Sequence, residues 1–326
     1  MTQRLKLSVL RHGPLLTTIT IFLLAYIIGA QLYPAMQRPQ AFFNLFINNG
    51  FLLILGIGMT FVILTGGIDL SVGGVLALTT AASAALLNLG VSPLVVMPLM
   101  LVMGTTIGLG LGCLIHFFKV QPFIVTLMGL FLARGLAYII SLTSVTITDP
   151  LYKYLALTPI YLPFFAKAYI YIPTLVGPAL LVVAVYLAYF TRFGRIVYAI
   201  GNNEQSAALM GFPVGRTKIL VYALSGFCSA LAGIVFSISL LAGYGQFATG
   251  VELDVIAAVV MGGTLLTGGV GNVIGTLFGI LIEATIISIL QYNGTLSSWW
   301  TRICVGVLTL IFIGIQSGFA LRKKKS

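Results

Sequence analysis

The stretch GMTFVILTGGIDLSVGGVLAL, residues 58–78, shows the pattern on which the whole chain is built. It joins two apolar runs through a glycine-rich segment, Gly66–Gly74, whose only ionisable side chain is Asp69. An apolar run of about 20 residues can cross a bilayer as a helix. We therefore predict that one membrane-spanning helix ends just before this segment and that the next begins just after Asp69.

The composition excludes a soluble globular protein. Of 326 residues, 59% are hydrophobic and only 7% are charged, whereas soluble domains carry roughly 25% charged residues. The formal net charge of +11 does not predict a nucleic-acid partner, because the basic side chains are scattered between apolar runs and form only one terminal cluster, Arg322–Lys325. Basic residues spread in this way are typical of the cytoplasmic loops of membrane proteins.

About ten apolar runs are candidate spans, and the range that we predict is eight to ten. They lie at 15–33, 45–65, 71–89, 93–117, 123–141, 173–191, 218–242, 253–269, 271–291 and 298–320. The third run is rich in small residues and the eighth is short, so either can be broken or re-entrant. The predicted fold is all-α: a single polytopic transmembrane bundle over residues 1–326.

The positive-inside rule orients this bundle. A cytoplasmic N-terminus places most of the 17 Lys and Arg residues on the cytoplasmic side, and an even number of spans then makes the C-terminus cytoplasmic as well. Two long loops leave the membrane, a cytoplasmic one at 192–217 and an external one at 142–172. The external loop, which is rich in Tyr, can lie along the outer interface or form part of a docking surface for an external protein.

A polar segment, GNNEQSAALMGFPVGRTKI at 201–219, interrupts the apolar pattern. Asn202 or Asn203 can cap a helix, and Glu204 in its first turn complements the helix dipole. Gly211 suits a left-handed stop and Pro213 prevents continuation. The segment therefore predicts a helix of about two turns at 204–210, too short to be stable alone in water.

This helix needs a surface to pack against. It can rest on the protein's own cytoplasmic face as a connector, or it can dock a partner. In the second case the small side chains of Ala207 and Ala208 let a partner approach the backbone, while Arg216 and Lys218 can pair with acidic partner residues.

Four stretches carry a resemblance to a known family. They are TRFGRIVYAIGNNEQSAALMGF followed by GRTKILVYALSG (191–226), together with 58–78, QPFIVTLMGLFLARGLAYIIS (121–141) and VVMGGTLLTGGVGNVIGTLFG (259–279). In this order they resemble the permease subunits of bacterial ribose-type sugar ABC importers, over nearly the whole chain. Within that family, the sequence is most similar to the permeases of the galactofuranose importer.

The resemblance implies a division of labour in the inner membrane. A periplasmic binding protein delivers a monosaccharide, two permease subunits form the path, and two ATPase subunits grip the coupling helices. The second permease can be identical or different. The docking residues that it implies are Asn203, Glu204, Ala207, Ala208, Gly211 and Arg216.

The chain itself is not expected to bind a cofactor or a metal. It contains no G-x-x-x-x-G-K-[ST] motif, which is the loop that cradles nucleotide phosphates. ATP and magnesium are therefore expected on the separate ATPase chain. No nucleophile–base motif is present either, so the prediction is a transport subunit without catalytic residues.

Candidate residues for the translocation path are of two kinds. Ionisable side chains inside a membrane are costly and mark functional sites: Asp69, Arg134 and Glu283. Asp69 can instead cap the third span by accepting N–H bonds from Ser71 or Val72, and Arg134 and Glu283 can pair with each other. A neutral sugar requires hydroxyl and amide partners, for which the candidates are Asn48, Asn49, Thr60, Thr126, Ser237 and Gln246.

One alternative function is a secondary transporter that works without an ATPase. It would use Asp69, Glu283 or Arg134 as the group that couples sugar uptake to an ion gradient.

Overall fold

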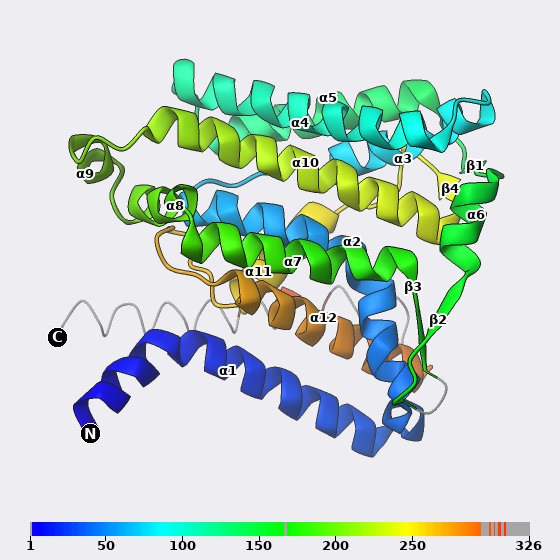
Figure 1. The fold of residues 1–326 in the computed structure, drawn as a ribbon, viewed down its shortest axis with the longest axis horizontal. Coiled ribbons are helices and arrows are strands. Elements are labelled where there is room, and N and C mark those ends of the chain that lie inside the picture. The colour runs from blue at the N-terminus through cyan, green and yellow to red at the C-terminus, as the bar shows by residue number, and fades with distance from the viewer. Residues whose placement is uncertain are drawn as a thin grey trace.

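The computed structural model describes residues 2–165 and 168–294, the side chains from residue 15 onward, and five isolated positions at 300, 303, 306, 307 and 310. The elements are mostly helices that run along one common direction (Figure 1). In chain order they are α1 (Thr2–Leu32), η1 (Pro34–Gln37), α2 (Pro39–Leu64), α3 (Val72–Asn88), α4 (Pro93–Phe117), α5 (Pro122–Ile140), β1 (Val145–Thr146), α6 (Pro150–Leu157), β2 (Pro159–Tyr161), β3 (Tyr169–Tyr171), α7 (Ile172–Phe190), α8 (Arg192–Asn202), α9 (Glu204–Leu209), α10 (Val214–Leu240), β4 (Ala242–Gly243), α11 (Val251–Met261) and α12 (Val273–Asn293).

Seven of the described helices are long and apolar enough to cross a membrane, namely α1, α2, α4, α5, α7, α10 and α12. Several begin at a proline, as α2, α4 and α5 do at Pro39, Pro93 and Pro122. Proline suits the first helical turn because the backbone N–H that it lacks has no partner there. The prediction of a polytopic all-α membrane protein is confirmed at this level.

Two of the predicted spans are shorter than the sequence suggested. The run at 71–89 forms α3, which has 17 residues, and the run at 253–269 forms only the 11 residues of α11. The second run ends early because Gly262 and Gly263 open a turn in which Gly263 has a φ of +92°. The span predicted at 298–320 and the basic cluster at 322–325 lie outside the described residues.

Helix α10 is central and packs against α2, α3 and α4. Its contact with α4 is made by backbone, because three glycines spaced four apart on α4, Gly104, Gly108 and Gly112, face it. A Cβ on Gly104 would lie 2.5 Å from the carbonyl oxygen of Gly226. Small residues at this spacing let membrane helices approach closely, and van der Waals contact then replaces the hydrophobic driving force that lipid removes.

The two ends of the bundle differ in structure (Figure 1). Helices α8 and α9 lie at one end, where α9 projects beyond the bundle; we call this the α9 end. At the opposite end, the α6 end, β1 pairs antiparallel with β4 and β2 pairs antiparallel with β3. The loop at 142–172 therefore contains a helix and three short strands that the all-α prediction did not include.

Candidate functional site

The polar segment forms the helix that its sequence predicts. Helix α9 covers Glu204–Leu209, and the Asn203 side chain caps it by accepting a hydrogen bond from the Ser206 backbone N–H at 2.7 Å. The chain turns away at Gly211, which has a φ of +77°. The cap and the stop lie where the sequence placed them, and the helix is one residue shorter than predicted.

An ion pair holds α9 against the bundle. The Lys218 ammonium on α10 donates to the Glu204 carboxylate at 2.6 Å. Lys218 is therefore engaged within the chain, although the sequence had suggested it as a partner for acidic residues of another protein. Arg216, two residues before Lys218 in α10, is exposed.

The orientation of α9 corrects the predicted docking surface. Ala207 is 0% exposed, so it packs against the protein's own helices, and it contributes nothing to an outward surface in this arrangement. Ala208 next to it is exposed, and the two large apolar side chains that follow are exposed as well, Leu209 at 89% and Met210 at 63%. We call Ala208, Leu209 and Met210 the apolar tip. Asn203, Glu204 and Gly211 are exposed around it.

Sequence reasoning missed Leu209 and Met210 because it looked for small and charged residues. A signal was present in the segment itself: a helix of about two turns can bury only one side, and Ala207 and Leu209 lie about 200° apart around it. The sequence alone does not say which of the two sides faces outward.

The predicted hydroxyl candidates inside the bundle connect helices to one another. Thr60 on α2 and Thr276 on α12 share a hydrogen bond of 2.6 Å between their hydroxyl groups. Thr126 on α5 donates to the carbonyl oxygens of Pro122, at 2.9 Å, and of Ile68, at 3.3 Å. Ser237 donates to the Ile234 carbonyl one turn earlier on α10. All three candidates are buried.

Asp69 also lies inside the bundle, with 1% of its surface exposed. One carboxylate oxygen accepts both the backbone N–H of Ser71, at 2.9 Å, and its hydroxyl, at 2.6 Å. The other accepts the Ser225 hydroxyl on α10 at 2.6 Å. The predicted N–H bond from Ser71 is confirmed, and the contact with Ser225 adds what the sequence did not show: Asp69 joins the start of α3 to the middle of α10.

The suggested pairing of Arg134 with Glu283 is wrong. The Arg134 guanidinium instead donates to three carbonyl oxygens of the segment between α10 and α11: Gly245 at 3.0 Å, Phe247 at 2.6 Å and Ala248 at 3.3 Å. Arg134 thus holds the segment 241–250 against α5. Glu283 is 3% exposed on α12, and its Oε2 atom has no hydrogen-bond partner among the described residues.

Four aromatic rings form a row between α2, α10 and the segment 241–250. The ring centroids of Phe51 and Phe236 are 4.6 Å apart, and those of Phe236 and Phe247 are 5.4 Å apart. Tyr244 extends the row at 5.4 Å from Phe247, and its hydroxyl donates to Oε1 of the exposed Gln246 at 2.7 Å. We call Phe51, Phe236, Phe247 and Tyr244 the aromatic row. Sequence reasoning picked out Gln246 but none of these rings.

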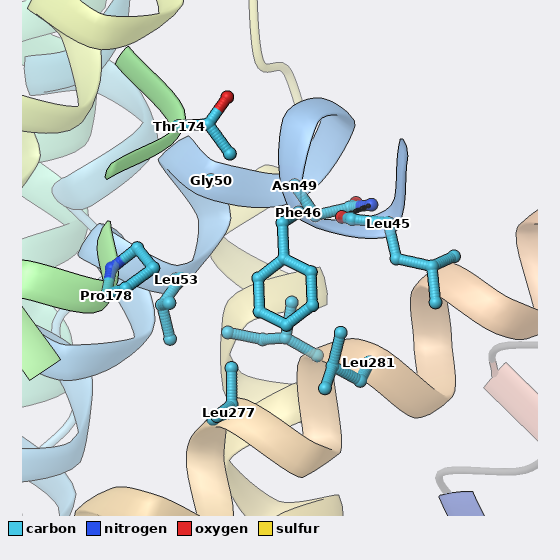
Figure 2. Close-up of a pocket in the computed structure, with 10 residues that line it drawn as sticks. Leu45, Phe46, Asn49, Gly50, Leu53, Thr174, Pro178, Leu277 and Leu281 are labelled. Carbon is cyan, nitrogen blue, oxygen red and sulfur yellow. Dashed lines mark hydrogen bonds between the residues drawn. The ribbon is translucent and has the colours of Figure 1, made fainter. Parts of the chain in front are cut away.

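A small pocket lies between α2, α7 and α12 (Figure 2). Its lining is mostly apolar, and Asn49 and Thr174 are the polar residues among those that line it. The Asn49 side chain donates to the Leu45 carbonyl at 2.9 Å, so its amide is partly engaged within its own helix. Asn48, its neighbour in the chain, is exposed. The pocket has few groups that could recognise a polar ligand.

A bundle with seven helices long and apolar enough to cross a membrane, and a pair of shorter helices at one end, is the architecture of a multi-pass membrane protein. The sequence matches, over residues 41–313, the family described as the permease component of branched-chain amino acid transport systems. This match covers most of the chain, so the protein belongs to that family.

Three relatives illustrate the similarity. The chain is 46% identical to the inner membrane ABC transporter permease protein YjfF of Escherichia coli K12, over 95% of this chain and 94% of that protein. It is 39% identical to the fructose import permease protein FruG of Bifidobacterium longum, over 93% and 90% of the two chains. It is 35% identical to the ribose import permease protein RbsC of Escherichia coli K12, over 89% of each. No solved structure matches. Together with the seven candidate spans, these relatives identify a multi-pass inner-membrane protein.

Proposed function

We propose that this chain is the permease subunit of an ATP-driven importer that moves a monosaccharide, of the galactofuranose or ribose kind, across the inner membrane. A periplasmic binding protein delivers the sugar, and a second permease, identical or different, completes the path. ATP and magnesium bind to a separate ATPase subunit. The proposal is supported by the family match and by the relatives that are named for the import of ribose and fructose.

The single observation that carries the proposal is the apolar tip. Leu209 at the end of α9 and Met210 directly after it are exposed, and α9 projects beyond the bundle (Figure 1). Burying a side chain of this size contributes roughly 1.5–3 kcal/mol, so a protein surface that covers the tip gains several kcal/mol on binding. The Asn203 cap and the Glu204 ion pair fix the helix beforehand, which lowers the entropy lost on docking. In this arrangement α9 is the coupling helix and the ATPase covers its outward side.

The path is expected to run past the aromatic row. Sugars present both C–H faces and hydroxyl groups, and protein sites for them combine an apolar surface with a few placed polar groups. The aromatic row supplies the apolar surface, and the exposed amide of Gln246 supplies a hydrogen-bonding group beside it. The buried hydroxyl groups of Thr60, Thr126 and Ser237 already have partners within the bundle and are assigned to packing.

The test is docking of the ATPase. The double variant Leu209→Asp with Met210→Asp is expressed in membranes with the ATPase subunits and the second permease, and the complex is purified through a tag on this chain. We expect the amount of co-purified ATPase to fall at least about tenfold, because the change of a hot-spot side chain at the centre of an interface costs about 2 kcal/mol or more. Sugar uptake falls with it.

The matched control is Leu89→Asp, which makes the same change at a side chain that is 79% exposed at the C-terminal end of α3. It is expected to leave co-purification unchanged. Undiminished ATPase binding by the double variant, or sugar uptake by the chain alone driven by a proton or sodium gradient, would contradict the proposal.

A further inference from the structure

Helix α8 connects α9 to the long helices of the bundle, because it packs against α7, α10 and α2 as well as against α9. It begins after Thr191, whose hydroxyl caps it through the Gly194 N–H. Its Phe193 ring packs against Phe61 of α2 with centroids 5.9 Å apart. It leads into α9 with only Asn203 between the two helices. A displacement of α9 therefore acts directly on α8, as it does on α10 through the Glu204–Lys218 ion pair.

The last turn of α8 meets two other backbone segments at a single point. The Gly269 N–H, in the turn between α11 and α12, donates to the Leu64 carbonyl at the end of α2 with a distance of 3.0 Å. Gly201 of α8 sits against this same hydrogen bond: a Cβ at Gly201 would collide with both the Leu64 oxygen and the Gly269 nitrogen. Three segments that are far apart in sequence thus touch through backbone atoms alone. We call this contact the glycine joint, made by Gly201, Leu64 and Gly269.

A side-chain hydrogen bond reinforces the joint. The Tyr198 hydroxyl, one turn earlier on α8, donates to the Gly271 carbonyl at 3.1 Å. Burial, together with the nearby Tyr189 hydroxyl, raises the pKa of Tyr198 above its usual value. The hydroxyl therefore keeps its proton, and remains a donor, throughout the physiological pH range.

The turn at the joint is the base of a tightly packed helix pair. A Cβ on Gly262 would lie 2.5 Å from the Gly275 carbonyl oxygen, and one on Gly279 would collide with the Ala258 carbonyl. Helices α11 and α12 therefore have backbone-to-backbone contact on both sides of the turn, and both also pack against α2. Because close-packed interiors shift between discrete arrangements and do not deform smoothly, a push on the turn moves this pair and the end of α2 together.

We propose that Gly201 is a positioning residue for transport: through the glycine joint, α8 passes the movement of the docked ATPase to α2 and to the α11–α12 pair. The inference rests on the proposed function, since it takes α9 as the docking helix. It adds the route by which movement of the docked ATPase is passed to the membrane-spanning helices. The hydrogen at Gly201 is required because even a methyl group would separate α8 from the Leu64–Gly269 hydrogen bond.

The test is the variant Gly201→Ala in the complete transporter, reconstituted into proteoliposomes with the ATPase, the second permease and the sugar-loaded binding protein. Four quantities are measured: co-purified ATPase, basal ATP hydrolysis, its stimulation by the binding protein, and sugar transported per ATP. We expect docking and basal hydrolysis to stay within about twofold of the unmodified complex, while sugar transported per ATP falls about tenfold, which is within the range for residues that couple two sites.

The matched control is Gly110→Ala on α4, where a Cβ meets no atom within 4 Å; it should leave all four quantities unchanged. A general loss of stability would lower basal hydrolysis and transport together, whereas the proposal requires them to separate. Unchanged sugar transported per ATP in Gly201→Ala overturns the inference. Loss of ATPase docking also overturns it, because the glycine joint would then be needed for assembly of the complex. Neither result touches the proposed function, which the apolar-tip variant tests by itself.

If Gly201→Ala does not accumulate in the membrane, the variant Tyr198→Phe tests the inference in its place. It removes one hydroxyl and keeps the ring, so the fold is retained. Loss of one hydrogen bond, worth about 1 kcal/mol, should lower the sugar transported per ATP about fivefold with docking intact. Unchanged sugar transported per ATP in this variant overturns the inference.

Discussion

The two ends of the bundle differ in how the segments outside the long helices are held. At the α6 end, the segments outside the helices are closed by contacts within the chain: β1 pairs with β4, Arg134 holds the segment 241–250, and Ile147 and Tyr152 are fully buried. At the α9 end, a capped helix and one ion pair present Leu209 and Met210 outward. The comparison shows that the loops of the α6 end are held by long-range contacts within the chain, although large apolar side chains such as Leu157 and Phe164 are exposed there as well. The exposed apolar side chains of the α9 end lie instead on a short projecting segment, which we propose that the ATPase covers.

The largest expected effect is on the α6 end. Arg134→Met keeps an unbranched apolar stem but removes the guanidinium, so the carbonyl oxygens of Gly245 and Phe247 lose their donor. An unsatisfied buried polar group costs about 1–3 kcal/mol, so we expect a loss of about 3 kcal/mol in stability, read as a lower Tm of the purified protein in detergent. The control Arg195→Met, at an exposed position on α8, should change the stability by less than about 0.5 kcal/mol. Equal Tm values for the two variants would mean that Arg134 does not close this end.

A smaller effect is expected where the α6 end meets the proposed path. Gln246→Ala removes an exposed amide beside the aromatic row and leaves the backbone bonds of Arg134 in place. Loss of one hydrogen bond of about 1 kcal/mol should raise the KM for sugar uptake about fivefold, with ATPase docking unchanged. Gln37→Ala, at an exposed glutamine between α1 and α2, is the control. An unchanged KM would show that Gln246 does not contact the sugar in the translocation path.

The smallest effect is expected for the ion pair at the α9 end. Glu204 is 54% exposed in its side chain, and its pair with Lys218 is accessible to salt. Exposed pairs contribute about 0.2–1 kcal/mol, so Glu204→Gln should weaken ATPase docking by less than about threefold, and less still at high salt. A much larger loss, insensitive to salt, would show that Glu204 contacts the ATPase directly, which would change the role of the apolar tip.

Much of the α9 end could be predicted because its signals are local. The Asn203 cap, the Gly211 stop and the intervening helix depend on backbone groups within a few residues, and those rules act in the same way in every fold. The pairing of Glu204 with Lys218, 14 residues apart, was not predictable in this way, because it depends on how the chain turns back into α10.

The α6 end was less predictable because its decisive contacts are distant in sequence. Arg134 reaches carbonyl groups more than 100 residues later in the chain, and backbone carbonyls carry no sequence signature. The paired strands at 145–146 and 242–243 are each two residues long. This is too short for the alternation of apolar and polar residues that identifies a strand in a sequence. The aromatic row likewise draws its rings from three separate elements.

The sequence by itself determined that this protein lies in a membrane as a helical bundle and carries one short capped helix outside it, because hydrophobic length and helix capping are local properties of the chain. Only the tertiary structure decided that Ala207 faces inward and Leu209 outward, that α11 stops after 11 residues, and that Gly201 meets Leu64 and Gly269. Each of these depends on which surfaces of separate helices come together, and packing is a relation between segments that no single segment encodes.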